Sequence, residues 1–365
     1  MKFDLDDDQA VLRDSVRRLL AAHYLPAERA AWIEGRRGTD APLWSRLAEF
    51  GILGATLPQS SGGIGGGPVE AMIVMGAIGA AQVVQPYLET AILCGAILKR
   101  CDTAEARAIL IEIVEGNAML SLAAHEPGPF TTRATRIAGG WSLTGAKPVV
   151  HSAPDATHLI ISALVKEKFA LFVVERHTAG LTLYNYTLAD GRSAADLVIA
   201  GLFVPDTALL ATDGRGLLDA AIDEAIAALC AEATAIMAEM LRLTVEHLGQ
   251  RRQFGQPLAG FQALQHKAAE MYMALDRATS AMHLASHAVS EPAETRKRLA
   301  SAAKVTISDS MRLIGETCVQ LYGGIGFVDD LPHSVHYKRL LVIDATLGGK
   351  AFHLARYRTL ANADH

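Results

Sequence analysis

The sequence predicts an α+β protein, mostly helical, in which a small β domain lies between two helical domains. Three stretches carry this prediction. Helical spacing of apolar residues extends over most of 4–118, short apolar runs separated by Gly, Pro, Asp and Thr fill 118–204, and a long amphipathic pattern covers 216–250. We therefore expect domains at residues 1–118, 119–212 and 213–365.

The N-terminal region is predicted to form helices that end at glycines. Asp4 or Asp6 is placed to cap a first helix, and residues 44–50 run into Gly51, a typical helix stop. A glycine-rich segment follows at 60–67. It lacks the preceding strand and the Lys-Ser/Thr pair of a phosphate-binding loop, so we interpret it as a structural loop.

The middle region predicts strands joined by tight turns. Apolar runs at 159–161, 169–174 and 197–199 have the character of buried strands. The pairs Gly139-Gly140 and Asp190-Gly191 are the expected turns. A sheet of short strands is therefore expected here.

The C-terminal region predicts long helices. The helix at 216–250 is the clearest, because its apolar residues step by three or four positions and form one buried stripe. Further helices are expected at about 261–288, 293–322 and 335–361.

Composition excludes several classes of function. The chain has 365 residues, is 50% hydrophobic and 20% charged, and carries a net charge of −5, as ordinary globular proteins do. Neither a nucleic acid nor a membrane is an expected partner, because no block of like charges exceeds Asp6-Asp7-Asp8 and no apolar run approaches the ~20 residues that span a bilayer. The acidic N-terminus is unlike a secretory signal, so we expect a cytoplasmic protein.

The four cysteines do not predict a metal site. They form neither a CxxC motif nor a Cys/His cluster, and buried thiols are the simplest interpretation. They are Cys94, Cys101, Cys230 and Cys318.

Two C-terminal segments have the chemistry of a nucleotide site. Arg251 follows the long helix, and its planar guanidinium suits a diphosphate. The amides of Gln262 and Gln320 can bond adenine or ribose, and Gly323-Gly324 lets the backbone come close to a ligand. Arg251 alone would more simply be a solvated arginine, but the whole set favours binding. The candidate cofactor residues are Arg251, Gln253, Phe254, Gln262, Gln320, Gly323 and Gly324.

These two segments contain three motifs: R-x-x-F-G at 251–255, F-Q-x-x-Q-H at 261–266 and Q-x-x-G-G-x-G-F at 320–327. In motifs and order the chain resembles the flavin-dependent acyl-CoA dehydrogenases, almost from end to end, and residues 141–147 are similar to the family's G-x-K strand pair. The resemblance implies an N-terminal helical domain, a middle β-barrel-like domain and a C-terminal four-helix bundle. It also implies FAD as cofactor, with these motifs holding the pyrophosphate and adenine end of the FAD of a neighbouring subunit.

The resemblance fails at the catalytic carboxylate. The reaction needs a base to take the α proton of the thioester while the β hydrogen leaves as hydride, and a carboxylate in a dry pocket suits that step. Ala225 and Gly348 occupy the two positions where the family carries it. Glu224 is a weak candidate, since one residue of offset turns a helical side chain by about 100°. The simpler interpretation of Asp223 and Glu224 is charges near the first turn of a helix.

The family's contacts to the flavin ring are also changed. Where it has Thr-Glu before Pro-Gly and a later Trp-Ile-Thr, this chain has residues 124–128 and 149–152, without an aromatic residue to wall the ring. His125 and His151 are candidates for contacting flavin or substrate, although satisfied or exposed histidines are the simpler interpretation.

This combination resembles the small subunits of heteromeric acyl-CoA dehydrogenases, such as the pimeloyl-CoA dehydrogenase small subunit and the paired enzymes of bacterial sterol and bile-acid side-chain degradation. It implies a heterotetramer acting on an acyl-CoA in fatty-acid or steroid side-chain β-oxidation. A second acyl-CoA dehydrogenase-like chain would supply the base, and electron-transfer flavoprotein is a candidate acceptor. Two alternatives stay open: a self-sufficient homo-oligomer that uses Glu224, and a flavin-free structural subunit.

Overall fold

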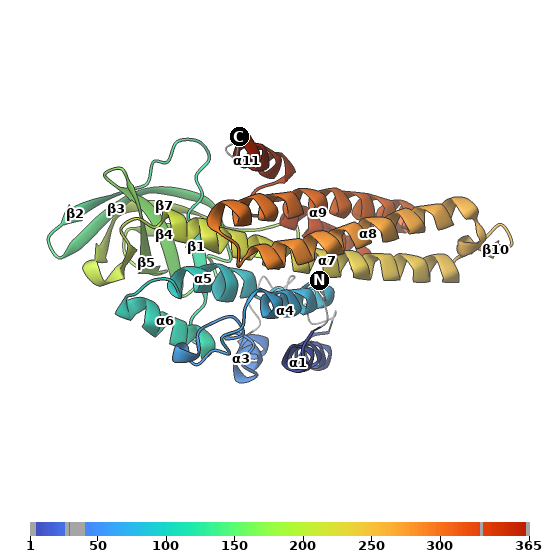
Figure 1. The fold of residues 1–365 in the computed structure, drawn as a ribbon, viewed down its shortest axis with the longest axis horizontal. Helices are drawn as coiled ribbons and strands as arrows, with labels where there is room; N and C mark the ends of the chain where they lie inside the picture. The colour runs from blue at the N-terminus through green and yellow to red at the C-terminus, as the bar shows by residue number, and fades with distance from the viewer. Residues whose placement is uncertain (1–4, 26–28, 30–40, 329–330, 363–365) are drawn as a thin grey trace. The chain divides into compact units, whose positions relative to one another are not determined.

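The computed structural model describes residues 5–25, 29, 41–328 and 331–362 (Figure 1). Within these ranges the chain is mostly helical, with helices before and after a β domain, which confirms the predicted fold class. It divides into two compact units. One comprises Met1–Leu25, Met72–Val83 and Ile226–His365, and the other Pro26–Ala71 and Val84–Ala225. Asp4, one of the two expected caps, lies outside the described residues.

The first helices begin and end where capping chemistry predicts. Helix α1 (Asp7–His23) begins at Asp6, whose carboxylate accepts from the Gln9 amide at 2.8 Å while the Gln9 side chain accepts from the Asp6 amide at 3.2 Å. This reciprocal pair is a capping box. Helix α3 (Ala41–Glu49) stops before Gly51, whose φ of +70° a helix cannot accommodate.

The glycine-rich segment after α3 is a loop, as predicted. A Cβ at Gly63 would lie 2.3 Å from the carbonyl oxygen of Leu57, and one at Gly66 would lie 2.5 Å from that of Ala55. Glycine is therefore required because two backbone segments pass in contact. The elements from this loop to the sheet are η1 (Gln59–Ser61), α4 (Pro68–Ala81), the π-helix η2 (Leu88–Cys94), α5 (Gly95–Leu98) and α6 (Ala104–Val114).

The β domain is an eight-stranded sheet in the order β6-β7-β3-β2-β4-β5-β8, with β1 parallel to β4. The predicted turn at Asp190-Gly191 is confirmed, because Gly191 (φ +87°) joins β6 to β7. The turn predicted at Gly139-Gly140 is one residue earlier: Gly139 (φ +77°) joins β2 to β3, and Gly140 is already the first residue of β3. The strands are β1 (Leu120–Ala123), β2 (Arg133–Ile137), β3 (Gly140–His151), β4 (His158–Val165), β5 (Lys168–Glu175), β6 (Leu181–Thr187), β7 (Ser193–Pro205) and β8 (Leu209–Ala211).

Long helices dominate the C-terminal region. Their bounds are α7 (Arg215–Gln250), α8 (Gln262–Ala288), α9 (Ala293–Tyr322), α10 (Pro332–Ala345) and α11 (Lys350–Asn362). The first three match the predicted ranges. The single helix expected at 335–361 is wrong, because the chain breaks between α10 and α11, where Leu347 (φ +57°) and Gly348 (φ +102°) are left-handed.

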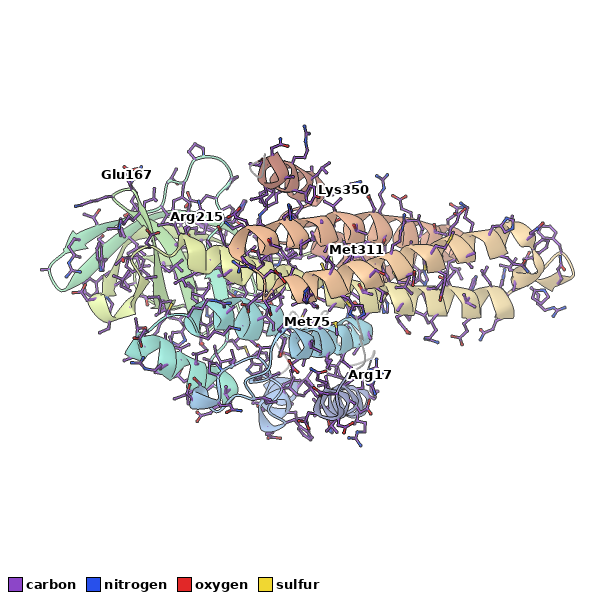
Figure 2. The ribbon with its side chains drawn as sticks, in the orientation of Figure 1. Arg17, Met75, Glu167, Arg215, Met311 and Lys350 are labelled. Atoms are coloured by element: carbon purple, nitrogen blue, oxygen red, sulfur yellow. The ribbon has the colours of Figure 1, made fainter. Side chains whose placement is uncertain are left out.

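The predicted apolar stripe of α7 is buried. Ile226, Leu229, Ile236 and Met240 are fully buried, as is most of the facing side of α9, where Met311 lies in the helical bundle (Figure 2). Burying each such side chain contributes roughly 1.5–3 kcal/mol. Packing of the bundle therefore provides the rigid frame from which its ends project.

The thiol prediction holds for three of the four cysteines, since Cys94, Cys230 and Cys318 are buried and free while Cys101 is half-buried. Across the described ranges, no cluster of His, Cys, Asp and Glu has the arrangement of a metal site. None of the helices described has both the length and the apolar character needed to cross a bilayer.

Candidate cofactor and active site

The predicted cofactor residues lie together at one end of the helical bundle. Helices α8 and α9 pack against each other and are joined by a short turn, so the start of α8 and the end of α9 share that end (Figure 1). The end of α7 is there too, because the Tyr322 hydroxyl of α9 donates to the Leu243 carbonyl at 3.0 Å. All seven candidate residues are exposed.

Arg251 begins a hairpin that follows α7. Its backbone N–H donates to His247 at 2.9 Å and its carbonyl accepts from Leu258 at 2.8 Å, which fixes the position of Cα. Its guanidinium is exposed and forms no ion pair with any residue that the structure describes. A fork of donors on a fixed backbone, without a carboxylate of its own, suits an anionic ligand from outside.

The hairpin presents an aromatic ring to solvent. Strands β9 (Arg252–Gln253) and β10 (Gln256–Pro257) are joined by Phe254 and Gly255, with φ values of +50° and +83°, as in a type I′ turn. Positive φ is uncommon for a phenylalanine. The Phe254 side chain is 91% exposed and meets Phe261 edge-on, with centroids 6.2 Å apart. Sequence reasoning predicted both the aromatic surface and the sharp exit at Gly255.

The two glutamines lie on different helices, and Gln320 comes shortly before an open glycine turn. Gln262 is the first residue of α8, and Gln320 lies in the last turn of α9. Gly323 ends α9 at φ +67° and ψ −142°, which is strained for any other residue. A Cβ added to Gly323 or Gly324 would meet nothing within 4 Å, so the turn leaves space for a ligand. Guanidinium, amides and open backbone fit the diphosphate and adenine end of FAD.

Neither expected base position holds a group that takes a proton. Ala225 of α7 is fully buried. Gly348 has no room for a side chain, since a Cβ there would lie 2.4 Å from the ring of Phe352. An acid at this position would need both a strained φ and a displaced phenyl ring.

The turn that carries Gly348 is held by two buried side chains. The Lys304 ammonium donates to the carbonyls of Ile343 at 2.6 Å and Thr346 at 3.0 Å, and the imidazole of His353 lies 3.1 Å from the Leu347 carbonyl. Burial lowers the pKa of Lys304 to about 8. Sequence reasoning missed both residues, because a lysine and a histidine inside helical patterns carry no signal of burial.

Glu224 is engaged by two cations. Its carboxylate accepts from Lys99 at 3.1 Å through one oxygen and from Arg100 through the other. The expectation of charges near the first turn of a helix is wrong, because α7 begins at Arg215 and both acids lie about two turns further on. Asp223 is only 1% exposed. Ion pairing at both oxygens leaves Glu224 poorly placed to accept a substrate proton.

The segment at 124–128 is pinned to the sheet through Glu126. This carboxylate accepts from Lys147 at 2.6 Å and from the Thr131 amide at 2.6 Å, while the buried Lys147 also donates to Ser162 at 3.0 Å. Burial would raise the pKa of Glu126, but the hydrogen bonds, that of Lys147 first, hold it at about 2. The neighbouring His125 is exposed.

Val149 shares a carboxylate with an aromatic residue of another strand, Tyr186. Val149 sits in a β-bulge of β3 with φ +51°, an outlier for a β-branched residue. Its N–H donates to Asp196 Oδ1 at 2.8 Å, and the Tyr186 hydroxyl donates to the same oxygen at 2.9 Å. Tyr186 belongs to β6, so comparing only the segment at 149–152 could not find it. The alternation of Tyr184 and Tyr186 along the strand was the available signal.

Comparison with known proteins identifies the family. Residues 6–117 match the model of the acyl-CoA dehydrogenase N-terminal domain, and residues 212–356 match that of its C-terminal domain. The chain belongs to the acyl-CoA dehydrogenase family. FAD, the cofactor of this family, is therefore confirmed as predicted.

Relatives match the chain over nearly its whole length. It is 27% identical to benzylmalonyl-CoA dehydrogenase from Aromatoleum aromaticum, over 91% of this chain and 92% of that protein. A variant of the steroid ACAD Tcur3481-Tcur3483 is 28% identical, with a TM-score of 0.89 over 98% of both chains. The ChsE4-ChsE5 complex from Mycobacterium tuberculosis, at 24% identity and a TM-score of 0.91 over 99% of both chains, shows the same fold.

Proposed function

We propose that this chain is one subunit of a heteromeric acyl-CoA dehydrogenase. In the proposed enzyme it holds the diphosphate and adenine end of FAD, and a second acyl-CoA dehydrogenase-like chain supplies the base. The observation that carries the proposal is the contrast between two parts of one fold: Arg251 and the glycine turn are kept and exposed, while Ala225 and Gly348 stand at both base positions.

The reaction is α,β-dehydrogenation of an acyl-CoA thioester. The base of the partner takes the α proton, a C=C bond forms, and the β hydrogen leaves as hydride. Bound FAD would supply the acceptor for that hydride. We propose electron-transfer flavoprotein as the acceptor that reoxidises it. The part of this chain is to bind and orient the cofactor from across an interface.

One observation on relatives supports a heteromer. The names of two similar solved structures, Tcur3481-Tcur3483 and ChsE4-ChsE5, each pair two different chains. The first is also named a steroid ACAD. We therefore propose a heterotetramer that acts in fatty-acid or steroid side-chain β-oxidation.

The test is activity with and without a partner. We expect the isolated chain to show little or no turnover of a panel of acyl-CoAs with an artificial electron acceptor, because Ala225 and Gly348 provide no base. Co-expression with a second, base-bearing acyl-CoA dehydrogenase chain encoded by a neighbouring gene should restore turnover. Glu224→Gln should leave the rate of the complex unchanged. Robust turnover by the isolated chain, lost in Glu224→Gln, would overturn the proposal in favour of a homo-oligomer with a displaced base.

A further inference from the structure

Three flat rings from three helices form one stack beneath the glycine turn. The imidazole of His247 lies against the phenol of Tyr322 with centroids 4.2 Å apart and planes 16° apart. The imidazole of His333 covers the other face, at 3.9 Å and 26°. The Tyr322 hydroxyl donates to the Leu243 carbonyl at 3.0 Å, so the central ring is held at its faces and at its tip.

The stack controls where the glycine turn starts. Tyr322 is the last residue of α9, and Gly323 follows it directly with φ +67° and ψ −142°, a conformation that only glycine adopts without strain. The far end of the turn is also fixed, because Gly326 lies against α9 so closely that a Cβ would be 2.5 Å from the Val319 carbonyl. The hydroxyl of Ser334, next to His333, donates to the Gly326 carbonyl at 3.3 Å. A shift of the stack would therefore move the turn as a whole.

His333 is built to be neutral. Its side chain is 1% exposed, and Nε2 has no hydrogen-bond partner within the described residues. It lies in the first turn of α10, where the helix dipole disfavours a cation. Burial lowers its pKa, while hydrogen bonding to the backbone of Gly326 and Ile325 opposes this. A proton on Nε2 would be buried without an acceptor, which is costly.

Glu246 is the carboxylate that faces the stack from α7, and it is paired with Arg242 at 3.0 Å rather than with His333. On the α7 side, Arg242 and Glu246 face Tyr322, and Arg251 faces His247, whose pKa is lowered first by burial and then by that arginine. On α9 the thiol of Cys318 faces Tyr322, and burial raises the pKa of this tyrosine to about 12. Beyond Tyr322, the ionisable group that His333 faces through the stack is His247, another potential cation.

We propose that the stack of His247, Tyr322 and His333 positions the Gly323-Gly324 turn for the cofactor, and does so only while His333 is neutral. This rests on the proposed function, since it takes the turn to be part of the FAD site. The sign follows from burial: the folded state binds the proton of His333 less well than the unfolded chain does. The stabilisation by the stack is complete above the unfolded pKa of about 6.5 and is lost as the pH falls below it.

The experiment compares three variants at pH values from 8 to 5. His333→Phe keeps a flat ring but cannot be protonated, Tyr322→Leu removes the centre of the stack, and His287→Phe changes an exposed histidine of α8 as a matched control. Hydrogen exchange of peptides covering 319–328, corrected for intrinsic rates, reports the turn in the isolated chain. The dissociation constant of FAD in the assembled complex reports the site.

We expect protection of the turn in the wild type and in His287→Phe to fall between pH 7 and 5, and the dissociation constant for FAD to rise over the same range. His333→Phe should keep protection at all pH values, and Tyr322→Leu should lack it throughout. Exchange that is independent of pH in the wild type, or unchanged pH dependence in His333→Phe, would overturn the inference. If the turn responds to pH but the affinity for FAD does not change, the stack still positions the turn, but the turn is not part of the FAD site.

Discussion

Arg251 is the residue on which the proposed cofactor site most depends. Its backbone is anchored at the end of α7, but its guanidinium is exposed and adds nothing to the packing of the bundle. Removing it should therefore change binding without changing folding. The sequence alone was enough to propose Arg251, because an arginine in R-x-x-F-G at a helix end can be recognised without knowledge of any tertiary contact.

Arg251→Ala should lower the affinity of the assembled complex for FAD. A charge-assisted hydrogen bond contributes about 1.5–3 kcal/mol, so the dissociation constant should rise by roughly 10- to 150-fold. Flavin fluorescence released on dilution measures it. Arg252→Ala, which removes the neighbouring exposed arginine, is the matched control and should have little effect. Unchanged affinity in Arg251→Ala, with both variants folded, would remove Arg251 from the site.

At the scale of elements, the turn between α10 and α11 shows where sequence prediction stops. A helical pattern continues through 335–361, but the helix is interrupted. Lys304 binds the carbonyls of Ile343 and Thr346 there, and His353 binds that of Leu347. Lys304 lies about forty residues before the turn, so no local pattern contains the reason for the break. The bulge at Val149 is similar, because Asp196 and Tyr186 from other strands define it.

The same turn should make folding stability depend on pH through His353. This side chain is fully buried, and burial, assisted by the charge of Lys304, lowers its pKa to about 4. The unfolded chain binds the proton more tightly, so stability is complete above about pH 6.5 and is lost as the pH falls toward 4. A difference of about 2.5 pKa units corresponds to roughly 3 kcal/mol in the free energy of unfolding.

Urea unfolding at pH 7, 6, 5 and 4.5 tests this dependence. His353→Gln should be less stable than the wild type at pH 7, because the contacts to Ser301 and the Leu347 carbonyl are weakened. Its stability should then fall less steeply with acid. His125→Gln, which changes an exposed histidine, should follow the wild type. Parallel pH profiles for His353→Gln and the wild type would show that His353 does not cause the loss.

At the scale of the whole molecule, the order of helices, sheet and helices was predictable because each region keeps one period of hydrophobicity over many residues. The residues that we propose for the cofactor came from sequence motifs, and their role stays a prediction. The sequence did not show that Gln262 and Gln320 lie at the same end of the bundle, where the packing of α8 against α9 places them. The sequence could not show which side chains contact each candidate residue. Glu224 looked available as a base until Lys99 and Arg100 proved to bind it.

The number of flavins in the assembly depends on which chain holds the flavin ring. We expect one FAD for every two chains, with the flavin ring against the β domain of the partner. Val149 gives less flat surface than an aromatic residue, and the Tyr186 hydroxyl is already bound to Asp196, which fixes that ring to its own sheet. Aromatic contacts add about 0.5–1.5 kcal/mol beyond area burial, so a missing wall should matter.

Tyr186 allows a direct test, because it is the one described aromatic residue that is bonded to the same carboxylate as Val149. If this chain held the ring, Tyr186→Leu should reduce flavin content; we expect the content to stay the same. Flavin absorbance after denaturation, divided by chain concentration, measures both quantities, and Tyr184→Leu on the same strand is the control. Two flavins per two chains, one of them lost in Tyr186→Leu, would contradict this prediction. This chain would then hold a flavin ring on its own β domain and would lack only the catalytic base.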